Sequence, residues 1–217
     1  MGLDWHPLGT PKPGHEAEFE ALYEQLCADN SKDPSLPRRM PQVAISPYET
    51  LGAPRVGSDA QADRWAMEQY AKRPWKKLFV SRRKFMRVFQ GYYVIELLPP
   101  NDGLPVYTNG GPGSYCDISA FRAQFLVHCF DAVGGELLGE AYLHHRAAEL
   151  VAYGTRLRAR AAAYAGEHRV TAVLGRRDVP DDAADLAHPA AQAHVVDSAG
   201  RWCLFWGERG HGMIADS

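Results

Sequence analysis

Apolar residues recur at helical spacing in the first third of the chain. Over residues 15–29, Phe19, Leu22 and Tyr23 stand at i, i+3 and i+4, followed by Leu26 at i+7. Apolar residues at this spacing form one face of a helix, so the stretch predicts an amphipathic helix that packs that face on a core. Residues 59–70 predict a second helix, with tryptophan and methionine among its larger side chains.

Two further helices are predicted in the middle of the chain. The apolar stripe over residues 117–133 consists of Ile118, Phe121, Phe125, Cys129 and Phe130. Residues 136–165 are rich in alanine and also helical, with Gly154 as a candidate interruption and Gly166 as the stop.

Strands are fewer than helices. YYVIELL, residues 92–98, is apolar and followed by two prolines, and VTAVL, residues 170–174, is short and β-branched. AHVVDSAGRWCLFWGE, residues 193–208, has two apolar runs around Asp-Ser-Ala-Gly, a pattern that predicts a hairpin. Because these strands do not alternate regularly with helices, we expect an α+β fold, helix-rich, with a small antiparallel sheet.

Length and turn residues define the expected domain organisation. The chain has 217 residues, which favours a single globular domain over residues 1–217. Residues 31–58 carry five prolines without a stable period. Long irregular connections are uncommon in compact domains, so this segment is interpreted as a proline-rich wrap or lid.

Composition and charge exclude several classes of protein. The chain is 46% apolar and 23% charged, as globular proteins are, and its net charge of -2 argues against a protein that coats nucleic acid. No apolar run approaches the ~18 residues of a membrane span, so no membrane partner is expected. The start lacks an apolar signal sequence, and the four cysteines are far apart. Both features predict a cytoplasmic protein with free thiols.

The segment GGPGSYCDISAFR, residues 110–122, contains the sharpest candidate chemistry. Cys116 and Arg122 have the C-x5-R spacing of cysteine-dependent phosphatases, in which backbone amides and the arginine hold a phosphate. No glycine lies between them to form an anion nest, and Asp117 would repel the phosphate. Asp117 is instead expected to cap the following helix, so a phosphatase is the least favoured alternative.

A small anionic ligand is the leading expectation for function. We expect Asn109, Gly110 and Gly111 to form a turn beside the ligand, because glycine lets a backbone approach closely. Arg122 and Arg82 would hold the charge.

Histidines supply the candidate acid-base groups of such a site. His144 or His145 would transfer protons if chemistry occurs, since Glu136, Glu140 and His144 recur every four residues. The alternative for these residues is ordinary surface pairing. No spacing in the chain indicates a complete set of metal ligands, and no cofactor follows from the sequence.

The most basic part of the chain supports a second function. Residues 72–87 contain eight lysines and arginines, interleaved aromatics and no acidic residue. Such a mixture can bind a small anion or an acidic protein surface, and nucleic acid is the less favoured partner because the whole chain is slightly acidic. The alternative function is therefore a non-catalytic interaction or accessory module.

Two short segments resemble an uncharacterised bacterial family. They are GLDW with PKPGHEAEF at the start of the chain, and NGG with FRAQFL around residues 109–126. The resemblance implies no activity and transfers no site residue.

Overall fold

The computed structural model describes residues 2–28, 35–72, 81–99, 104, 115–178 and 185–216. Two compact units form: Met1–Ile45 with Asn101–Ser217, and Ser46–Pro100. The expected helix-rich α+β fold with a small antiparallel sheet is confirmed, whereas the single domain stays a prediction. No helix within the described ranges is both long and apolar enough to cross a membrane.

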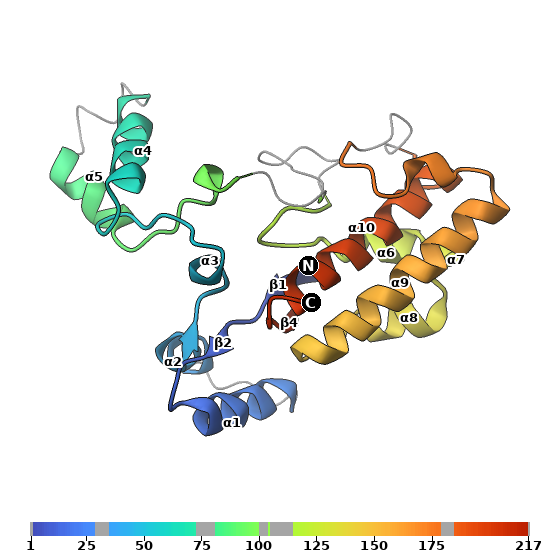
Figure 1. Ribbon diagram of the computed structural model, residues 1–217, viewed down its shortest axis with the longest axis horizontal. Helices are drawn as coiled ribbons and strands as arrows, with labels where there is room; N and C mark the ends of the chain where they lie inside the picture. Colours follow the sequence, from blue (N-terminus) through green and yellow to red (C-terminus); the bar gives the residue numbers. More distant parts are fainter. Residues whose placement is uncertain are drawn as a thin grey trace. The chain divides into compact units, whose positions relative to one another are not determined.

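The first unit brings the two ends of the chain together (Figure 1). β1 (Asp4–Pro7) pairs antiparallel with β4 (Met213–Asp216), with Trp5 opposite Ala215. A second antiparallel pair joins β2 (Thr10–Pro11) to β3 (Ala44–Ile45).

α1 (Glu16–Cys27) and α2 (Leu36–Val43) follow β2 and share a small apolar cluster. Phe19, Leu22 and Tyr23 are the buried residues of α1, so the predicted amphipathic helix is confirmed. Within the expected wrap, residues 36–43 are helical and 44–45 are extended, so ordered structure occupies much of that segment.

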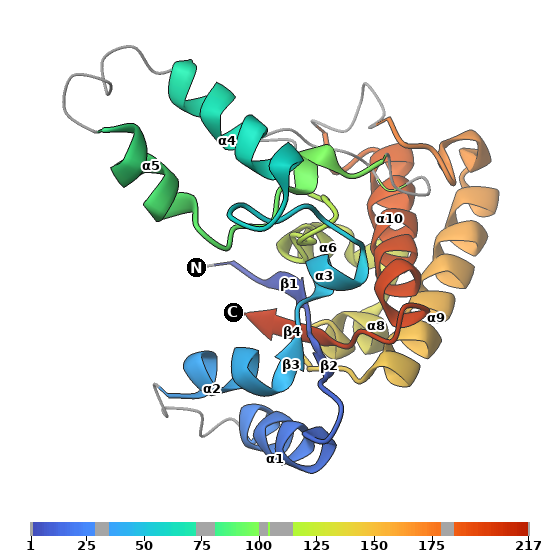
Figure 2. The same ribbon diagram turned by 60° about the vertical axis from the view of Figure 1, so that its left-hand side comes forward.

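Two long helices form the centre of the first unit. α9 (Ala147–Glu167) and α10 (Pro189–Gly207) lie side by side along their lengths in both views (Figures 1 and 2). α10 is buried nearly all round, including Trp202 and Trp206, which are fully buried. A helix that is buried on nearly every side is stable only inside a protein.

The predicted hairpin over residues 193–208 is therefore wrong. Short apolar runs fit a buried helix as well as a buried strand, and Asp-Ser-Ala-Gly is helical here rather than a turn. His188 begins the helix by accepting a hydrogen bond from the Ala190 amide at 3.2 Å, and Pro189 occupies the first turn.

Glycines permit the close contact between α9 and α10. A Cβ at Gly154 would lie 2.7 Å from Cys203 Cβ, and a Cβ at Gly200 would lie 2.8 Å from the Gly154 carbonyl oxygen. α9 runs through Gly154 without interruption. This glycine, a candidate helix break in the sequence, is instead a packing position.

The expected helix over residues 136–165 divides in two. α8 (Gly135–Glu140) ends before Ala141, and α9 begins at Ala147. The intervening segment pairs with β4, because His145 and Met213 exchange backbone hydrogen bonds of 3.0 and 2.8 Å. Glu136, Glu140 and His144 therefore do not share one helical face, which corrects that expectation.

The expected helix over residues 117–133 is also shorter than predicted. It becomes α6 (Gln124–His128) and α7 (Phe130–Val133). Phe121 instead lies in an extended segment that bridges Trp5 and Cys116, and the rings of Trp5 and Phe121 are 5.0 Å apart. Packing around the fully buried Trp5 replaces the local helical preference.

The second unit is a small helical assembly with its own core. It contains α3 (Pro47–Thr50), α4 (Ala60–Ala71), α5 (Arg82–Phe89) and the 3₁₀ turn η2 (Ile95–Leu97). The core is formed by Val56, Ala62, Ala66 and Val94, with Trp65, Met86, Phe89 and Leu97 packed against it.

The helix predicted over residues 59–70 is confirmed as α4, whereas the strands predicted over residues 92–98 and 170–174 are wrong. Residues 92–98 form one isolated bridge, Arg55 with Tyr93, and then η2. Residues 171–173 form the 3₁₀ turn η3 (Thr171–Val173) in the first unit. Both runs are apolar because they cover a core, but within the described chain neither has a neighbouring strand to extend a ladder.

Candidate functional site

The residues predicted to form an anion site are not brought together within the described chain. Asn109, Gly110 and Gly111 lie outside the described residues. Arg122 donates from Nε to Asp4 Oδ1 at 3.3 Å, so its charge is already paired with β1. Arg82 belongs to α5 in the second unit, whereas Arg122 and both histidines belong to the first. Among the described residues, each unit thus contains only part of the predicted set.

Both candidate histidines make structural contacts. His144 Nδ1 accepts a hydrogen bond from the Ala215 amide at 3.1 Å. His145 is buried, its Nε2 lies 3.0 Å from the Glu140 carbonyl oxygen, and its ring stacks on Tyr153 at 4.9 Å. These contacts hold β4 and the start of α9 in place. A proton-transfer role for His144 or His145 stays a prediction.

Asp117 caps a turn rather than a helix. Its Oδ1 accepts from the Ser119 amide and hydroxyl, both at 2.6 Å, and from the Ala120 amide at 2.7 Å. The first helix after it begins only at Gln124. The expected helix cap is therefore wrong, because the carboxylate closes a local turn that precedes the bridge at Phe121.

The surroundings of Cys116 argue against a phosphatase. Burial raises the pKa of its thiol well above the ordinary value, and the Asp117 carboxylate raises that pKa further. A nucleophilic cysteine needs a lowered pKa and access to its substrate. Cys116 is 3% exposed and does not lie at a helix N-terminus.

An open cleft of ≈ 610 Å³ lies within the second unit. Glu49 and Asp59 line it, together with Arg55 and Tyr93. Tyr93 donates its hydroxyl to Glu49 Oε2 at 3.1 Å, and the Arg55 guanidinium lies 5.2 Å from the centre of the Tyr93 ring. Two carboxylates against one arginine make this cleft a poor site for an anion.

Charge is unevenly distributed between the two units. Residues 46–100 hold ten lysines and arginines and five acidic residues, a net charge of +5. The rest of the chain therefore carries -7, which makes the total of -2. The whole-chain value conceals a basic second unit, in which eight of the ten lysines and arginines belong to the basic stretch over residues 72–87.

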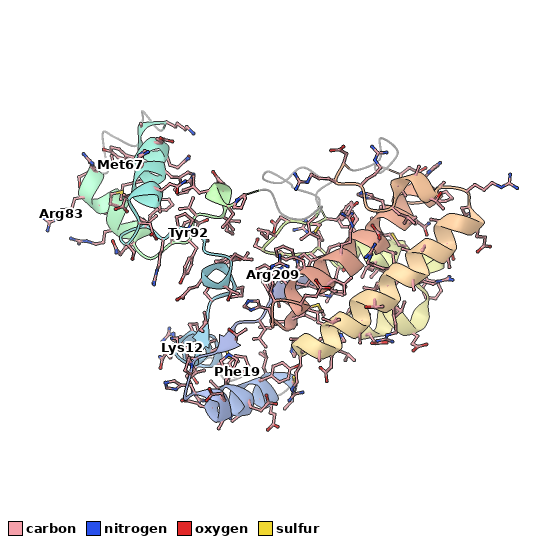
Figure 3. The ribbon with its side chains drawn as sticks, in the orientation of Figure 1. Lys12, Phe19, Met67, Arg83, Tyr92 and Arg209 are labelled. Atoms are coloured by element: carbon pink, nitrogen blue, oxygen red, sulfur yellow. The ribbon has the colours of Figure 1, made fainter. Side chains whose placement is uncertain are left out.

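α5 displays this positive charge on one side. Ser81 begins the helix by accepting a hydrogen bond from the Lys84 amide at 3.3 Å, while Phe85 is buried. Arg83, Lys84 and Arg87 are exposed, and we call these three residues the α5 basic face. Figure 3 shows the Arg83 side chain directed away from α4. Arg82 lies toward the packed side, where its Nε is 3.1 Å from Met67 Sδ.

The positive charge of the α5 basic face is not neutralised by any carboxylate that the structure describes. Within the described part of the chain, none of its three side chains makes an ion pair. Arg83 and Arg87 are one turn apart, as like charges that repel. Arg83 and Lys84 also lie in the first turn, where the helix dipole disfavours cations. An anionic partner would relieve all of these unfavourable interactions.

The first unit contains a buried polar cluster that the sequence did not reveal. Asp197 on α10 lies between Arg201 and Arg158, with Nε to carboxylate distances of 2.9 and 3.4 Å, and its side chain is 3% exposed. It also accepts from the Gly175 amide at 2.9 Å. The cluster connects α9, α10 and the turn after η3. Among the described residues, no group of three histidine, cysteine or acidic side chains could hold a metal ion.

His194 lies beside this cluster, and its burial predicts that the protein loses stability in weak acid. Its ring is buried between the Tyr115 hydroxyl and the Arg176 carbonyl oxygen, and burial lowers the pKa of the imidazole to about 4. Burial also lowers the pKa of His211.

An unfolded histidine titrates near pH 6.5, so between pH 6.5 and 4 the unfolded chain binds more protons than the folded one. We expect the free energy of unfolding to fall by up to about 3 kcal/mol across this range through His194 alone. Urea unfolding at several pH values measures it. The variant His194→Asn should be less stable at neutral pH, but its free energy of unfolding should change less between pH 6.5 and 4. An equally steep loss of stability in this variant would contradict the role given to His194.

Comparisons with known proteins add no further evidence. No protein-family model matches the chain, and no curated protein and no solved structure is significantly similar to it. The resemblance of the GLDW and FRAQFL segments to a bacterial family stays a prediction.

Proposed function

We propose that this protein is a non-catalytic interaction module that binds an acidic partner through the α5 basic face. The observation that carries the proposal is the set of three exposed cations on one side of α5, none of them paired with a carboxylate among the described residues. The net charge of +5 on residues 46–100 supports it. We also propose a cytoplasmic location, since all four cysteines are free.

A small anionic ligand with histidine chemistry has less support. The described residues of that expected site are divided between units or already hold structural contacts, as Arg122 does with Asp4. The α5 basic face is the surface of a helix and takes no part in the cleft of the second unit. A flat or convex cationic surface suits a macromolecular partner better than a small molecule, which needs concave walls.

The test is the binding of a fluorescently labelled oligo-glutamate peptide. The double variant Arg83→Glu with Arg87→Glu should bind it roughly tenfold or more weakly, because two attractive contacts become repulsive. Fluorescence anisotropy at about 50 mM salt measures the affinity, which should fall as added salt screens the exposed charges.

A matched double variant controls for the change in total charge. Arg38→Glu with Arg176→Glu introduces the same change at two exposed arginines of the first unit. Its affinity should remain within about twofold of the parent. Equal losses in both variants would mean that only net charge matters, and the proposed site would then be abandoned.

A further inference from the structure

An exposed apolar side chain lies beside the α5 basic face. Val88 is 75% exposed and stands one helical turn after Lys84, so the two side chains are neighbours on the helix surface. The apolar side chains with which α5 contacts its own unit are different ones, namely Phe85, Met86 and Phe89. Val88 therefore serves neither the core of the second unit nor the positive charge.

Valine at this position brings α5 no local advantage. A β-branched side chain lowers helix propensity, and an exposed position permits lysine, glutamate or alanine at no cost to packing. A single exposed valine is common on protein surfaces. Val88, however, stands next to three cations that have no carboxylate partner within the described ranges. One side of this short helix therefore offers both an apolar and a charged contact.

We infer that the partner of this surface is an acidic protein segment that carries a large apolar side chain among its carboxylates. The inference rests on the proposed function and specifies its partner. Carboxylates would meet Arg83, Lys84 and Arg87, and the apolar side chain would cover Val88. Charged contacts steer the encounter, and the apolar contact adds affinity that survives in salt.

A nucleic acid fits this surface less well. Its affinity comes from many cations along a phosphate backbone, whereas the α5 basic face has three. Val88 also has no ring on which a base could stack.

Two labelled peptides of equal length and equal net charge test the inference. One interleaves glutamate with leucine, and the other has serine in place of each leucine. The parent protein should bind the leucine peptide about fivefold more tightly, and this preference should persist at about 500 mM salt. An oligothymidylate of equal charge provides the nucleic-acid comparison.

The variant Val88→Ala isolates the apolar contact. It should remove most of the fivefold preference and leave the serine peptide unchanged. Alanine is the better helix former, so α5 should keep its structure. The control is Leu143→Ala, which shortens a similarly exposed aliphatic side chain, 55% exposed, in the first unit. This control should bind both peptides as the parent does.

Each result separates the inference from the function on which it rests. Equal binding of the two peptides, with no effect of Val88→Ala, would overturn the apolar contact and leave the acidic partner intact. Binding of neither peptide would overturn both proposals. Tighter binding of the oligothymidylate than of either peptide would overturn a protein partner.

Discussion

Asp197→Asn should lower the free energy of unfolding by about 3 to 5 kcal/mol, the largest effect expected of any single conservative change considered. The Asp197 carboxylate is buried against Arg201, whose side chain is only 10% exposed. Asparagine keeps the shape but removes the negative charge. The Arg201 guanidinium would then lose the Asp197 carboxylate in a site largely closed to water, and the Gly175 amide would lose a charged acceptor.

Urea unfolding followed by circular dichroism at neutral pH measures this loss. The matched control is Glu20→Gln, which removes the charge from an exposed ion pair with Arg146. Exposed ion pairs contribute little to stability, so the free energy of unfolding of this variant should fall by at most about 1 kcal/mol. If both variants lost the same small amount, the buried cluster would not stabilise the first unit.

Gly154→Ala should destabilise the protein by about 1 to 3 kcal/mol, against the usual effect of replacing a helical glycine by alanine. The new Cβ would lie 2.7 Å from Cys203 Cβ and 2.9 Å from the Gly200 carbonyl oxygen. Neither atom lies at the end of a flexible side chain. α9 and α10 would have to move apart, and contacts along both helices would loosen.

A second glycine in α9 provides the comparison. A Cβ at Gly166 meets no atom within 4 Å, so Gly166→Ala should stabilise the protein by up to about 1 kcal/mol through helix propensity alone. Thermal unfolding of the two variants should therefore shift in opposite directions. Stabilisation by both substitutions would show that the helices do not pack as closely as described.

Local periodicity predicted elements correctly where one face is buried and the other is exposed. In α1, Phe19, Leu22 and Tyr23 are the buried residues, as their spacing predicts. Periodicity was misleading for α10, because burial on nearly all sides places apolar residues all around the helix and buries polar ones such as His194 and Asp197 as well. The candidate site was mispredicted for a different reason. Helical spacing placed His144 on one face with Glu136 and Glu140, but α8 ends at Glu140, before His144.

The sequence by itself determined the helices α1 and α4, the helix-rich class and the position of the basic segment, because each depends on residues close together along the chain. Only the tertiary structure decided that Arg83, Lys84 and Arg87 have no carboxylate partner among the described residues, while Arg122 pairs with Asp4, 118 residues away. Ion pairing and close helix packing join residues that are distant in sequence. Local sequence patterns therefore do not predict which distant residues come into contact.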